Sequence, residues 1–290
     1  SSDPFRVPIR AEKFVVLNST DELLQLVAAG ELKTGPFLFL GGGSNVLFTD
    51  TSYKGLILHN RCKGIRIVRE DANRVSIKVS GGENWHELVL HCIRLGWGGI
   101  ENLSLIPVTV GAAPIQNIGA YGVELKDVLE EVETIELQTG RPRIFSLAEC
   151  QFGYRDSYFK QEGKGKYFIS SVTLSLTKVN HALHTQYGAI RQVLDEQMIS
   201  APTIGDIAQA VISIRQSKLP DPAKIGNAGS FFKNPTVNVD VHKQLLARFP
   251  ELPGYAVDAH QVKVPAGWLI ERCGFKGVNR NQVGVHKDQA

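Results

Sequence analysis

The segment from Asn102 to Val123 restricts the fold more than any other feature, because it carries no charged residue and is long enough to cross a membrane. A glutamine, asparagines, two prolines and three glycines interrupt it, and in lipid the backbone groups that they free would have no partners. We therefore predict a buried, loop-rich segment of a globular protein, with no membrane insertion. The residues from Ser1 to Lys13 include Arg6 and Arg10 and form no apolar run, so they predict no secretion signal and favour a cytoplasmic location.

The composition supports a folded protein with a sizeable core. Hydrophobic residues make up 43% of the 290 residues and charged residues 21%, which excludes a disordered chain and a coiled coil. The net charge of +3 does not by itself indicate a nucleic-acid partner, and we expect none. The 4 cysteines lie far apart and the 8 histidines show no metal-ligand spacing, so we expect no metal site and a reducing compartment. Without heptads, a monomer is expected.

Apolar periodicity and turn residues divide the chain into three regions, 1–60, 61–200 and 201–290, which we predict to be domains. The first shows a strand–helix–strand–loop–strand order, with strands at 13–17, 37–40 and 56–58 and a helix at 19–27. The second adds a hairpin at 65–80, a helix at 83–95 and strands at 128–137 and 167–176. The third adds helices at 204–215, 241–249 and 266–273, the last with Pro265 as its first helical residue. This mixture predicts an α+β fold.

A glycine-rich loop follows the strand at 37–40 directly. It consists of Gly41, Gly42, Gly43, Ser44 and Asn45. Glycines let backbone N–H groups approach a phosphate closely, and the serine and asparagine side chains add donors. The loop is neither a Rossmann fingerprint nor a P-loop, because the third glycine and the Gly-Lys-Ser/Thr sequence are missing. A tight structural loop and a phosphate site explain it equally well.

A second loop with little side-chain bulk runs from Ile106 to Gly122. Its small residues would let a flat ring lie against the main chain, and Gln116 and Asn117 could hydrogen-bond the edge of a heterocycle. Taken alone, the segment is better explained as a buried crossover loop. Together, the two uncharged loops suit a long cofactor with a pyrophosphate and an aromatic ring.

Three groups of polar residues are further candidates for chemistry. Arg155 lies among aromatic residues and could stabilise developing negative charge, or it could form an ion pair with Asp156. Arg215 and Lys218 share one side of a helix end, where they could clamp an anion or simply favour the helix dipole. Ser230 lies in a polar loop that lacks the glycines of a nucleophile elbow, so a hydrolase has little support.

Five motifs, taken together, resemble a known family. They are Leu40–Leu47, Ile106–Leu125, Phe152–Ser157, Lys218–Pro222 and Gly229–Pro235, and they closely resemble the UDP-N-acetylenolpyruvoylglucosamine reductases (MurB), with Tyr187 and Gly188 similar to the type I subgroup. The resemblance implies a three-domain α+β flavoenzyme, with two FAD-binding domains of the vanillyl-alcohol-oxidase type and a third, substrate-binding domain. It implies non-covalent FAD, NADPH as the reductant, and UDP-N-acetylglucosamine enolpyruvate as the substrate of a step in peptidoglycan synthesis.

The resemblance also implies roles for single residues. Arg155 would be the catalytic arginine, and Ser230 would donate a proton to the carbon next to the carboxylate. The expected substrate-binding residues are Tyr121, Tyr187, Lys218 and Asn234, and Arg215 joins them as an anion-binding candidate. The expected FAD-binding residues are Gly41, Gly42, Gly43, Ser44, Asn45, Ile106, Pro107, Thr109, Gly111, Ile115, Gln116, Asn117 and Gly119.

The chain departs from the family pattern at three places. The family's catalytic glutamate lies in a segment near the C-terminus that this sequence, which ends at Ala290, does not contain, so we expect a truncated or incomplete sequence. Val108 stands where the family usually has glycine, and a β-branched residue there disfavours a positive φ and adds bulk near the flavin. Of an N-terminal Asn-Thr-Phe, only Phe5 is present. Two alternatives therefore stay open, an FAD-dependent oxidase of the same fold and a catalytically impaired flavin- or UDP-sugar-binding protein.

Overall fold

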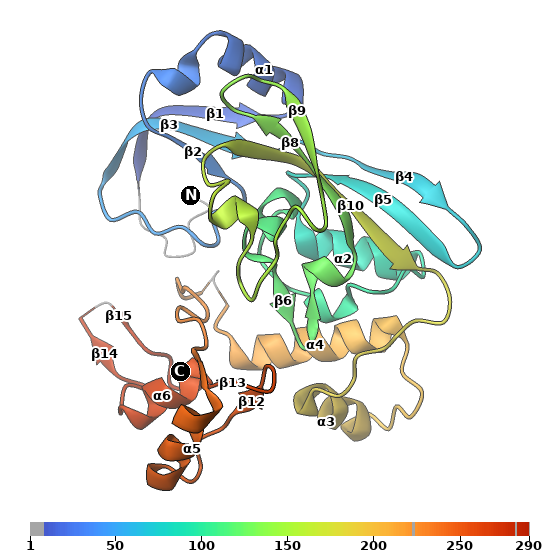
Figure 1. Ribbon diagram of the computed structural model, residues 1–290, viewed down its shortest axis with the longest axis vertical. Helices are drawn as coiled ribbons and strands as arrows, with labels where there is room; N and C mark the ends of the chain where they lie inside the picture. Colours follow the sequence, from blue (N-terminus) through green and yellow to red (C-terminus); the bar gives the residue numbers. More distant parts are fainter. Residues whose placement is uncertain (1–8, 222–223, 282, 290) are drawn as a thin grey trace. The chain divides into compact units, whose positions relative to one another are not determined.

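The computed structural model describes residues 9–221, 224–281 and 283–289, and Phe5 lies outside them. The chain forms two compact units, Ser1–Arg215 and Gln216–Ala290, and each is described by itself (Figure 1). The α+β mixture that we predicted from the sequence is confirmed. The division into domains at 1–60, 61–200 and 201–290 stays a prediction.

The first sheet of unit 1 contains three parallel strands in the order β1-β3-β2. Its strands are β1 (Arg10–Leu17), β2 (Phe37–Leu40) and β3 (Ser52–Asn60), and the bounds of β2 are those predicted. Helix α1 (Thr20–Ala28) follows β1, and its Ser19 cap accepts a hydrogen bond of 3.3 Å from the backbone N–H of Glu22. Leu23 of α1 is fully buried against Leu17 and Leu58 of the sheet, which confirms the expected small α/β arrangement.

The second sheet of unit 1 is antiparallel and has five strands in the order β4-β5-β10-β8-β9. The predicted hairpin is confirmed as β4 (Ile65–Glu70) and β5 (Arg74–Ser80), and the two later predicted strands as β8 (Leu129–Glu136) and β10 (Tyr167–Thr177). The edge strand β9 (Pro142–Ser146) was not predicted, because it begins with proline and mostly faces solvent.

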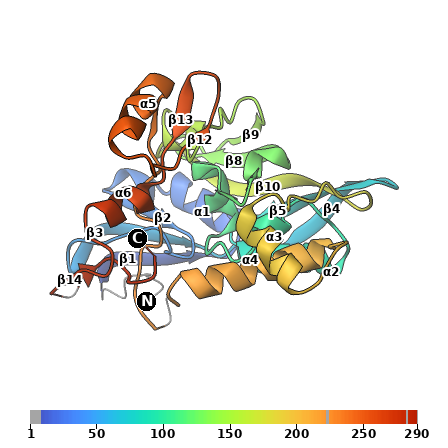
Figure 2. The ribbon, with the colours of Figure 1, turned by 90° about the horizontal axis from the view of Figure 1, so that it is seen from below.

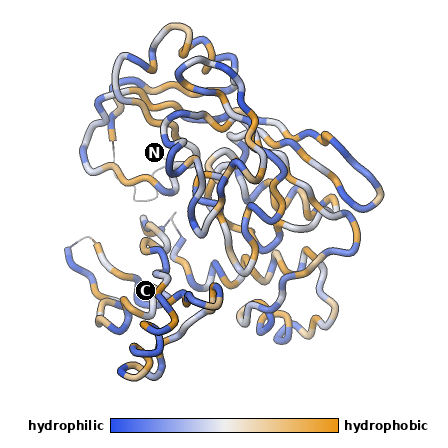
Figure 3. The backbone as a smooth tube through the Cα atoms, in the orientation of Figure 1, coloured by the Kyte–Doolittle hydropathy of each residue, from blue (hydrophilic) through white to orange (hydrophobic). Residues whose placement is uncertain are grey.

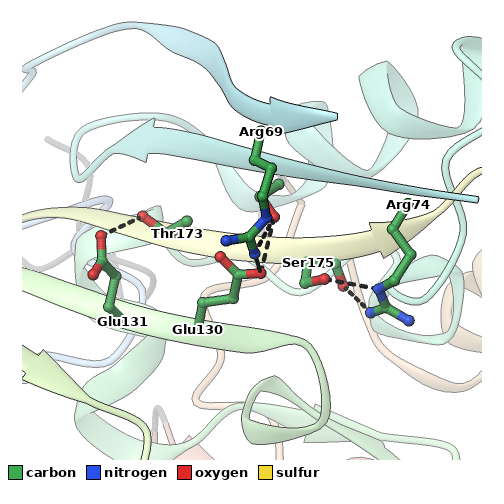
Figure 4. Close-up of polar contacts among 7 residues, drawn as sticks. Arg69, Arg74, Glu130, Glu131, Thr173 and Ser175 are labelled. Atoms are coloured by element: carbon green, nitrogen blue, oxygen red, sulfur yellow. Dashed lines mark hydrogen bonds and ion pairs between the residues drawn. The ribbon is translucent and has the colours of Figure 1, made fainter. Parts of the chain in front are cut away.

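The two faces of this sheet differ in polarity. On β5, Val75, Ile77 and Val79 are fully buried and pack with Trp85 of α2 (Trp85–Arg94). The opposite face carries hydrogen-bonded polar side chains, including Arg69 with Glu130, Thr173 with Glu131, and Arg74 with Ser175 (Figure 4). The β4–β5 pairing shifts its register next to Arg69, and the β10–β8 pairing shifts its register next to Glu130. Such irregularities change the face toward which a side chain points, and both residues lie on this polar face. Glu130 and Glu131, which looked like a solvated charge pair, are therefore bonded to neighbouring strands.

The segment between α2 and β8, which includes the uncharged stretch, is a chain of short turns, as predicted. It contains the 3-10 helices η2 (Glu101–Leu103), η3 (Val110–Gln116) and η4 (Leu125–Asp127) and the two-residue strands β6 (Gly119–Ala120) and β7 (Val123–Glu124). Most of its apolar side chains are buried in the core that also holds α2 and the second sheet. Within residues 9–221, 224–281 and 283–289, no helix has both the length and the apolar character needed to cross a bilayer. Figure 3 shows hydrophobic and hydrophilic colours alternating along even the long helix α4 (Ile204–Lys218).

Two helices complete unit 1. Helix α3 (Gly188–Glu196) was not predicted, and it packs through Ile190 and Leu194 against Ile207 and Val211 of α4. Helix α4 begins after Thr203, as expected, and extends three residues beyond the predicted end. Figure 2 shows α2, α3 and α4 gathered on one side of the strands of the second sheet.

Unit 2 contains a small antiparallel sheet in the order β11-β13-β12 and two helices. The predicted helices are α5 (Val239–Arg248) and α6 (Ala266–Arg272), and Pro265 is the N-cap of α6 rather than its first helical residue. The strands are β11 (Thr236–Asn238), β12 (Tyr255–Ala256) and β13 (Gln261–Lys263), with a further pair of β14 (Asn279–Arg280) and β15 (Val283–Gly284).

Candidate functional site

The two glycine-rich loops meet in unit 1. A Cβ atom at Gly41 would overlap Oγ1 of Thr109, and one at Gly42 would lie 3.9 Å from the carbonyl oxygen of Pro107. The second loop is also held at Gly111, whose N–H donates a 2.8 Å hydrogen bond to the carbonyl oxygen of Gly81. Glycine at 41 is therefore required by the proximity of the other loop. The expectation that the two loops lie together is confirmed.

The first loop presents unpaired donors. Within the part of the chain that the structure describes, the backbone N–H groups of Gly42, Gly43, Ser44 and Asn45 make no hydrogen bond, and neither do the side chains of Ser44 and Asn45. Gly43 has a φ of 71°, a left-handed conformation that turns successive N–H groups toward one concave side. A row of free N–H groups beside a second backbone-rich loop fits the pyrophosphate of a dinucleotide.

The expected FAD-binding residues of the second loop differ in how far they are buried. Ile106 and Gly111 are buried, Thr109, Gln116 and Gly119 are half-buried, and Pro107 and Ile115 are exposed. The Asn117 side chain is fully buried and committed to the protein. Its Nδ2 donates to Oε2 of Glu124 at 3.0 Å and to the carbonyl oxygen of Gly153 at 3.1 Å, and its Oδ1 accepts from the N–H of Lys126 at 3.1 Å. Both N–H groups of the Asn117 amide are therefore used within the protein, so Gln116 is better placed to donate to a heterocycle, and FAD binding by either residue stays a prediction.

Val108 does not strain the loop in the way its sequence position suggested. It is absent from the residues with positive φ and its side chain is buried in the core beside Trp85. The N–H of Trp85 donates a 3.0 Å hydrogen bond to the carbonyl oxygen of Val108. The concern that a β-branched residue here would resist a positive φ is thus removed, and Leu105, with a φ of 60°, takes that conformation instead.

Arg155 is fixed by backbone contacts on both of its ends. Its Nη2 donates a 2.7 Å hydrogen bond to the carbonyl oxygen of Gly119, and its own carbonyl oxygen accepts a 2.8 Å bond from Nζ of Lys160. Among the residues that the structure describes, no carboxylate forms an ion pair with Arg155, so the alternative of a pair with Asp156 is not seen. The guanidinium therefore places a positive charge beside the second loop without a direct ion pair among the described residues.

Tyr121, Tyr187 and Arg215 come together next to this charge. The rings of Tyr121 and Tyr187 meet edge to face with centroids 5.8 Å apart, and Tyr121 packs against the α3–α4 core. Burial raises the pKa of Tyr121, and a polar contact with Arg215 lowers it in part. Burial lowers the pKa of Arg215, and the charge of nearby Arg155 lowers it further. Nε of Arg215 is buried without a hydrogen-bond partner. The structure thus brings together four of the expected site residues.

Three of the eight non-glycine residues with positive φ in the described parts of the chain lie at the same place. Asn117, Tyr121 and Arg155 have φ values of 42°, 50° and 56°, which L-residues with side chains rarely adopt. Such conformations persist where surrounding contacts over-determine them, and they cluster at functional sites. The sequence interpretation missed two residues that supply such contacts, Glu124 and Asn102. The signal for Asn102 was a polar side chain at the start of an otherwise apolar segment.

The other three expected residues belong to unit 2. Ser230 is exposed in a loop that Asn227 orders, since Nδ2 of Asn227 donates to the carbonyl oxygen of Ile225 at 3.0 Å and its Oδ1 accepts from the N–H of Gly229 at 3.1 Å. Lys218 is exposed and ends α4. Oδ1 of Asn234 accepts a 2.9 Å hydrogen bond from the N–H of Ala266 and so caps α6, which leaves the Nδ2 group for a ligand.

Comparison with known proteins decides the family. A UDP-N-acetylenolpyruvoylglucosamine reductase of Pseudomonas fluorescens is 49% identical over 286 residues, which cover 99% of this chain and 84% of that protein. The corresponding protein of Chromobacterium violaceum is 48% identical over 287 residues, with 99% and 84% covered. The chain belongs to the UDP-N-acetylenolpyruvoylglucosamine reductase family.

Two family models agree with this membership, and one solved structure shares the fold. The model described as an FAD binding domain matches residues 11–145, and the model of the UDP-N-acetylenolpyruvoylglucosamine reductase C-terminal domain matches residues 221–290. The crystal structure of the reductase (MurB) from Thermus caldophilus has a TM-score of 0.62 at 22% identity and covers 95% of this chain and 78% of that one. The α+β flavoenzyme fold that the resemblance implied is confirmed, and both glycine-rich loops lie in the match to the FAD binding domain.

Proposed function

We propose that this protein reduces UDP-N-acetylglucosamine enolpyruvate to UDP-N-acetylmuramate, with FAD as cofactor and NADPH as reductant, in peptidoglycan precursor synthesis. The observation that carries the proposal is the 49% identity to a reductase of this name over 99% of the chain. Two features of the described residues support it: the N–H groups of the first loop that have no partner there, and the guanidinium of Arg155, which forms no direct ion pair. An oxidase and a non-catalytic binding protein lack a comparable observation.

The residues of the two loops fit FAD. The free N–H groups from Gly42 to Asn45 would hold the pyrophosphate, and the segment from Ile106 to Gly119 would lie against the ring. When bound, FAD supplies a carrier that takes hydride from NADPH and gives it to the enolpyruvyl double bond. Thr109, whose Oγ1 lies against Gly41, would help to join the two parts of this site.

Positive charge in unit 1 suits the developing charge of the reaction. Hydride addition to the enolpyruvyl group moves negative charge toward its carboxylate, and preorganised donors lower the barrier to that change. Arg155 has one hydrogen bond to Gly119 and further N–H groups without partners among the described residues. We assign it the stabilisation of this charge. Tyr121, Tyr187 and Arg215 would bind the UDP-sugar around it.

Protonation completes the reduction. The carbon next to the carboxylate needs a proton, and we assign its delivery to the hydroxyl of Ser230, which is exposed in the loop that Asn227 orders. A serine hydroxyl is a weak acid, and a cation such as Lys218 would make proton release easier. The free Nδ2 group of Asn234 would contact the UDP-sugar. We also propose that the protein acts as a monomer in the cytoplasm, and the 4 free cysteines fit a reducing compartment.

Anaerobic stopped-flow absorbance of the FAD-loaded protein tests the function. NADPH should bleach the flavin band, and UDP-N-acetylglucosamine enolpyruvate, added second, should restore it. Recovery with oxygen alone, at a rate that the UDP-sugar does not change, would support the oxidase instead. Tight binding of the UDP-sugar without recovery of the band would support the non-catalytic binding protein.

A further inference from the structure

We propose that Asn102 is a positioning residue that holds Tyr121 and Tyr187 together as one substrate-binding edge. The inference rests on the proposed function, because the two tyrosines are taken to contact the UDP-sugar. Asn102 lies in the 3-10 helix η2 and its side chain is fully buried. Its hydrogen bonds go to His184 and to Tyr121, which follows the last expected FAD-binding residue, Gly119, so its role differs from FAD binding.

One amide group of Asn102 joins two distant parts of the chain. Its Nδ2 donates a 3.1 Å hydrogen bond to the carbonyl oxygen of Tyr121 and a 2.9 Å bond to the carbonyl oxygen of His184. Tyr187 follows His184 by three residues, and its ring meets the ring of Tyr121 with centroids 5.8 Å apart. The same amide therefore anchors the backbone of Tyr121 and, at His184, the segment that leads to Tyr187.

The chemistry of the site requires an amide. Oδ1 of Asn102 is buried without a partner, so the observed orientation leaves one acceptor unsatisfied in order to place both N–H groups on the two carbonyl oxygens. The reversed amide would set an oxygen against two oxygens, which is repulsive. Tyr121 also has a φ of 50°, and a strained residue needs external contacts to keep its conformation.

Neighbouring residues show that the pairing of the rings is close. A Cβ atom at Gly122 would lie 3.7 Å from Cδ2 of Tyr187, so the backbone after Tyr121 is in contact with the Tyr187 ring. The ring of Tyr187 is nevertheless 54% exposed, so burial alone holds it weakly. Loss of the Asn102 hydrogen bonds should therefore release residues 180–187 and separate the two rings.

Two variants at this position test the proposal, with a matched control in the same turn. Asn102→Asp puts a carboxylate against two carbonyl oxygens, and Asn102→Ala removes both donors without adding charge, so it carries the test if Asn102→Asp does not fold. The control is Ser104→Ala, because Ser104 is also fully buried and its hydroxyl donates a 2.7 Å bond to Glu101, away from both tyrosines. All proteins are studied in full length with FAD bound.

Two readouts separate positioning from general destabilisation. Hydrogen exchange of residues 180–187, followed by mass spectrometry, should speed up in the Asn102 variants and stay as in the parent in Ser104→Ala. The KM for UDP-N-acetylglucosamine enolpyruvate should rise roughly tenfold, the loss expected from about 1.4 kcal/mol of binding, while kcat and the FAD content change little.

Equal effects of the Asn102 variants and Ser104→Ala on both readouts would overturn the proposal, as would loss of FAD together with faster exchange throughout unit 1. If the parent protein does not turn over the UDP-sugar, the proposed function fails, whereas the exchange of residues 180–187 still decides whether Asn102 holds this segment.

Discussion

Nη2 of Arg155 donates a 2.7 Å hydrogen bond to the carbonyl oxygen of Gly119, which joins a candidate catalytic side chain to the backbone of a candidate cofactor loop. The bond fixes one arm of the guanidinium, and the remaining N–H groups have no partner among the described residues. Because Arg155 itself has a φ of 56°, its position depends on these contacts rather than on backbone preference. We therefore expect the planar shape of the Arg155 guanidinium, and not only its positive charge, to contribute to activity.

Arg155→Lys should lower kcat by about a hundredfold or more, because an ammonium cannot both hold Gly119 and present a planar fork to the developing carboxylate charge. Reduction of the flavin by NADPH should change much less, so the loss should fall on the second half-reaction in stopped-flow traces. Arg143→Lys is the matched control, since Arg143 stacks on the Phe145 ring at 4.2 Å and is not among the candidate site residues. Equal losses in both variants would contradict the assignment of Arg155.

Gly41→Ala should reduce the FAD content of the purified protein, because the added methyl group would overlap Oγ1 of Thr109 and separate the two loops. Combining it with Thr109→Ala removes the overlapping atom. The loss of FAD content in the double variant should therefore be smaller than the sum of the losses in the two single variants. Gly35→Ala is the control, since a Cβ atom at Gly35 meets nothing within 4 Å. The measurement is the ratio of flavin to protein absorbance, and strict additivity would count against the overlap.

Acid should destabilise the protein partly through His86. Burial lowers the pKa of His86 below its ordinary value of 6.5, and Nδ1 accepts a 3.0 Å hydrogen bond from the N–H of Leu105, which requires the neutral ring. Below pH 6.5 His86 is protonated in the unfolded chain but stays neutral in the folded protein. The free energy of unfolding therefore falls as the pH drops toward the lowered pKa of the folded state. His59, whose pKa burial also lowers, acts in the same direction.

Urea unfolding at about pH 7.5 and about pH 5.5 measures this dependence. The free energy of unfolding of His86→Gln should fall less between the two pH values than that of the parent, although the variant is less stable at the higher pH. A steeper fall in His86→Gln would contradict the role of His86.

Thiol labelling should distinguish one cysteine from the other three. Cys62, Cys92 and Cys150 are buried, and burial raises the pKa of Cys92 and of Cys150 to about 12, so little reactive thiolate forms at neutral pH. Cys273 is exposed. Titration with a chromogenic disulfide should show one fast thiol in the native protein and four in denaturant, and Cys273→Ser should remove the fast phase. Rapid labelling of a second thiol would contradict the described core.

Local pattern was sufficient to predict most elements of unit 1. The strand at 37–40 and the hairpin at 65–80 could be found because their apolar runs end at glycine or polar turn residues. Helix α3 was missed, because its sequence follows an irregular segment and only Ile190 and Leu194 are buried. Strand β9 was missed because it begins with proline and mostly faces solvent, so its own sequence shows no alternation of apolar and polar residues, although it pairs with the preceding strand β8.

The sequence was sufficient to find the motifs of the candidate site, but not to predict what each side chain in them contacts. Gly41 and Thr109 lie far apart in sequence, and composition alone suggested that their loops act together. The Asn117 amide looked like a ligand group, but burial and three hydrogen bonds assign it to the fold. Asn102 contacts only backbone carbonyl oxygens of distant residues, and the sequence carries no record of such contacts.

The proximity of Arg155 and Arg215, without a carboxylate paired to either in the described residues, also has a kinetic consequence. Two like charges without a direct ion pair favour a local positive potential, which draws a polyanionic nucleotide sugar through solution before any contact forms. Added salt shortens the range of that attraction. The encounter rate should therefore depend on ionic strength more strongly than the rate of the chemical step that follows.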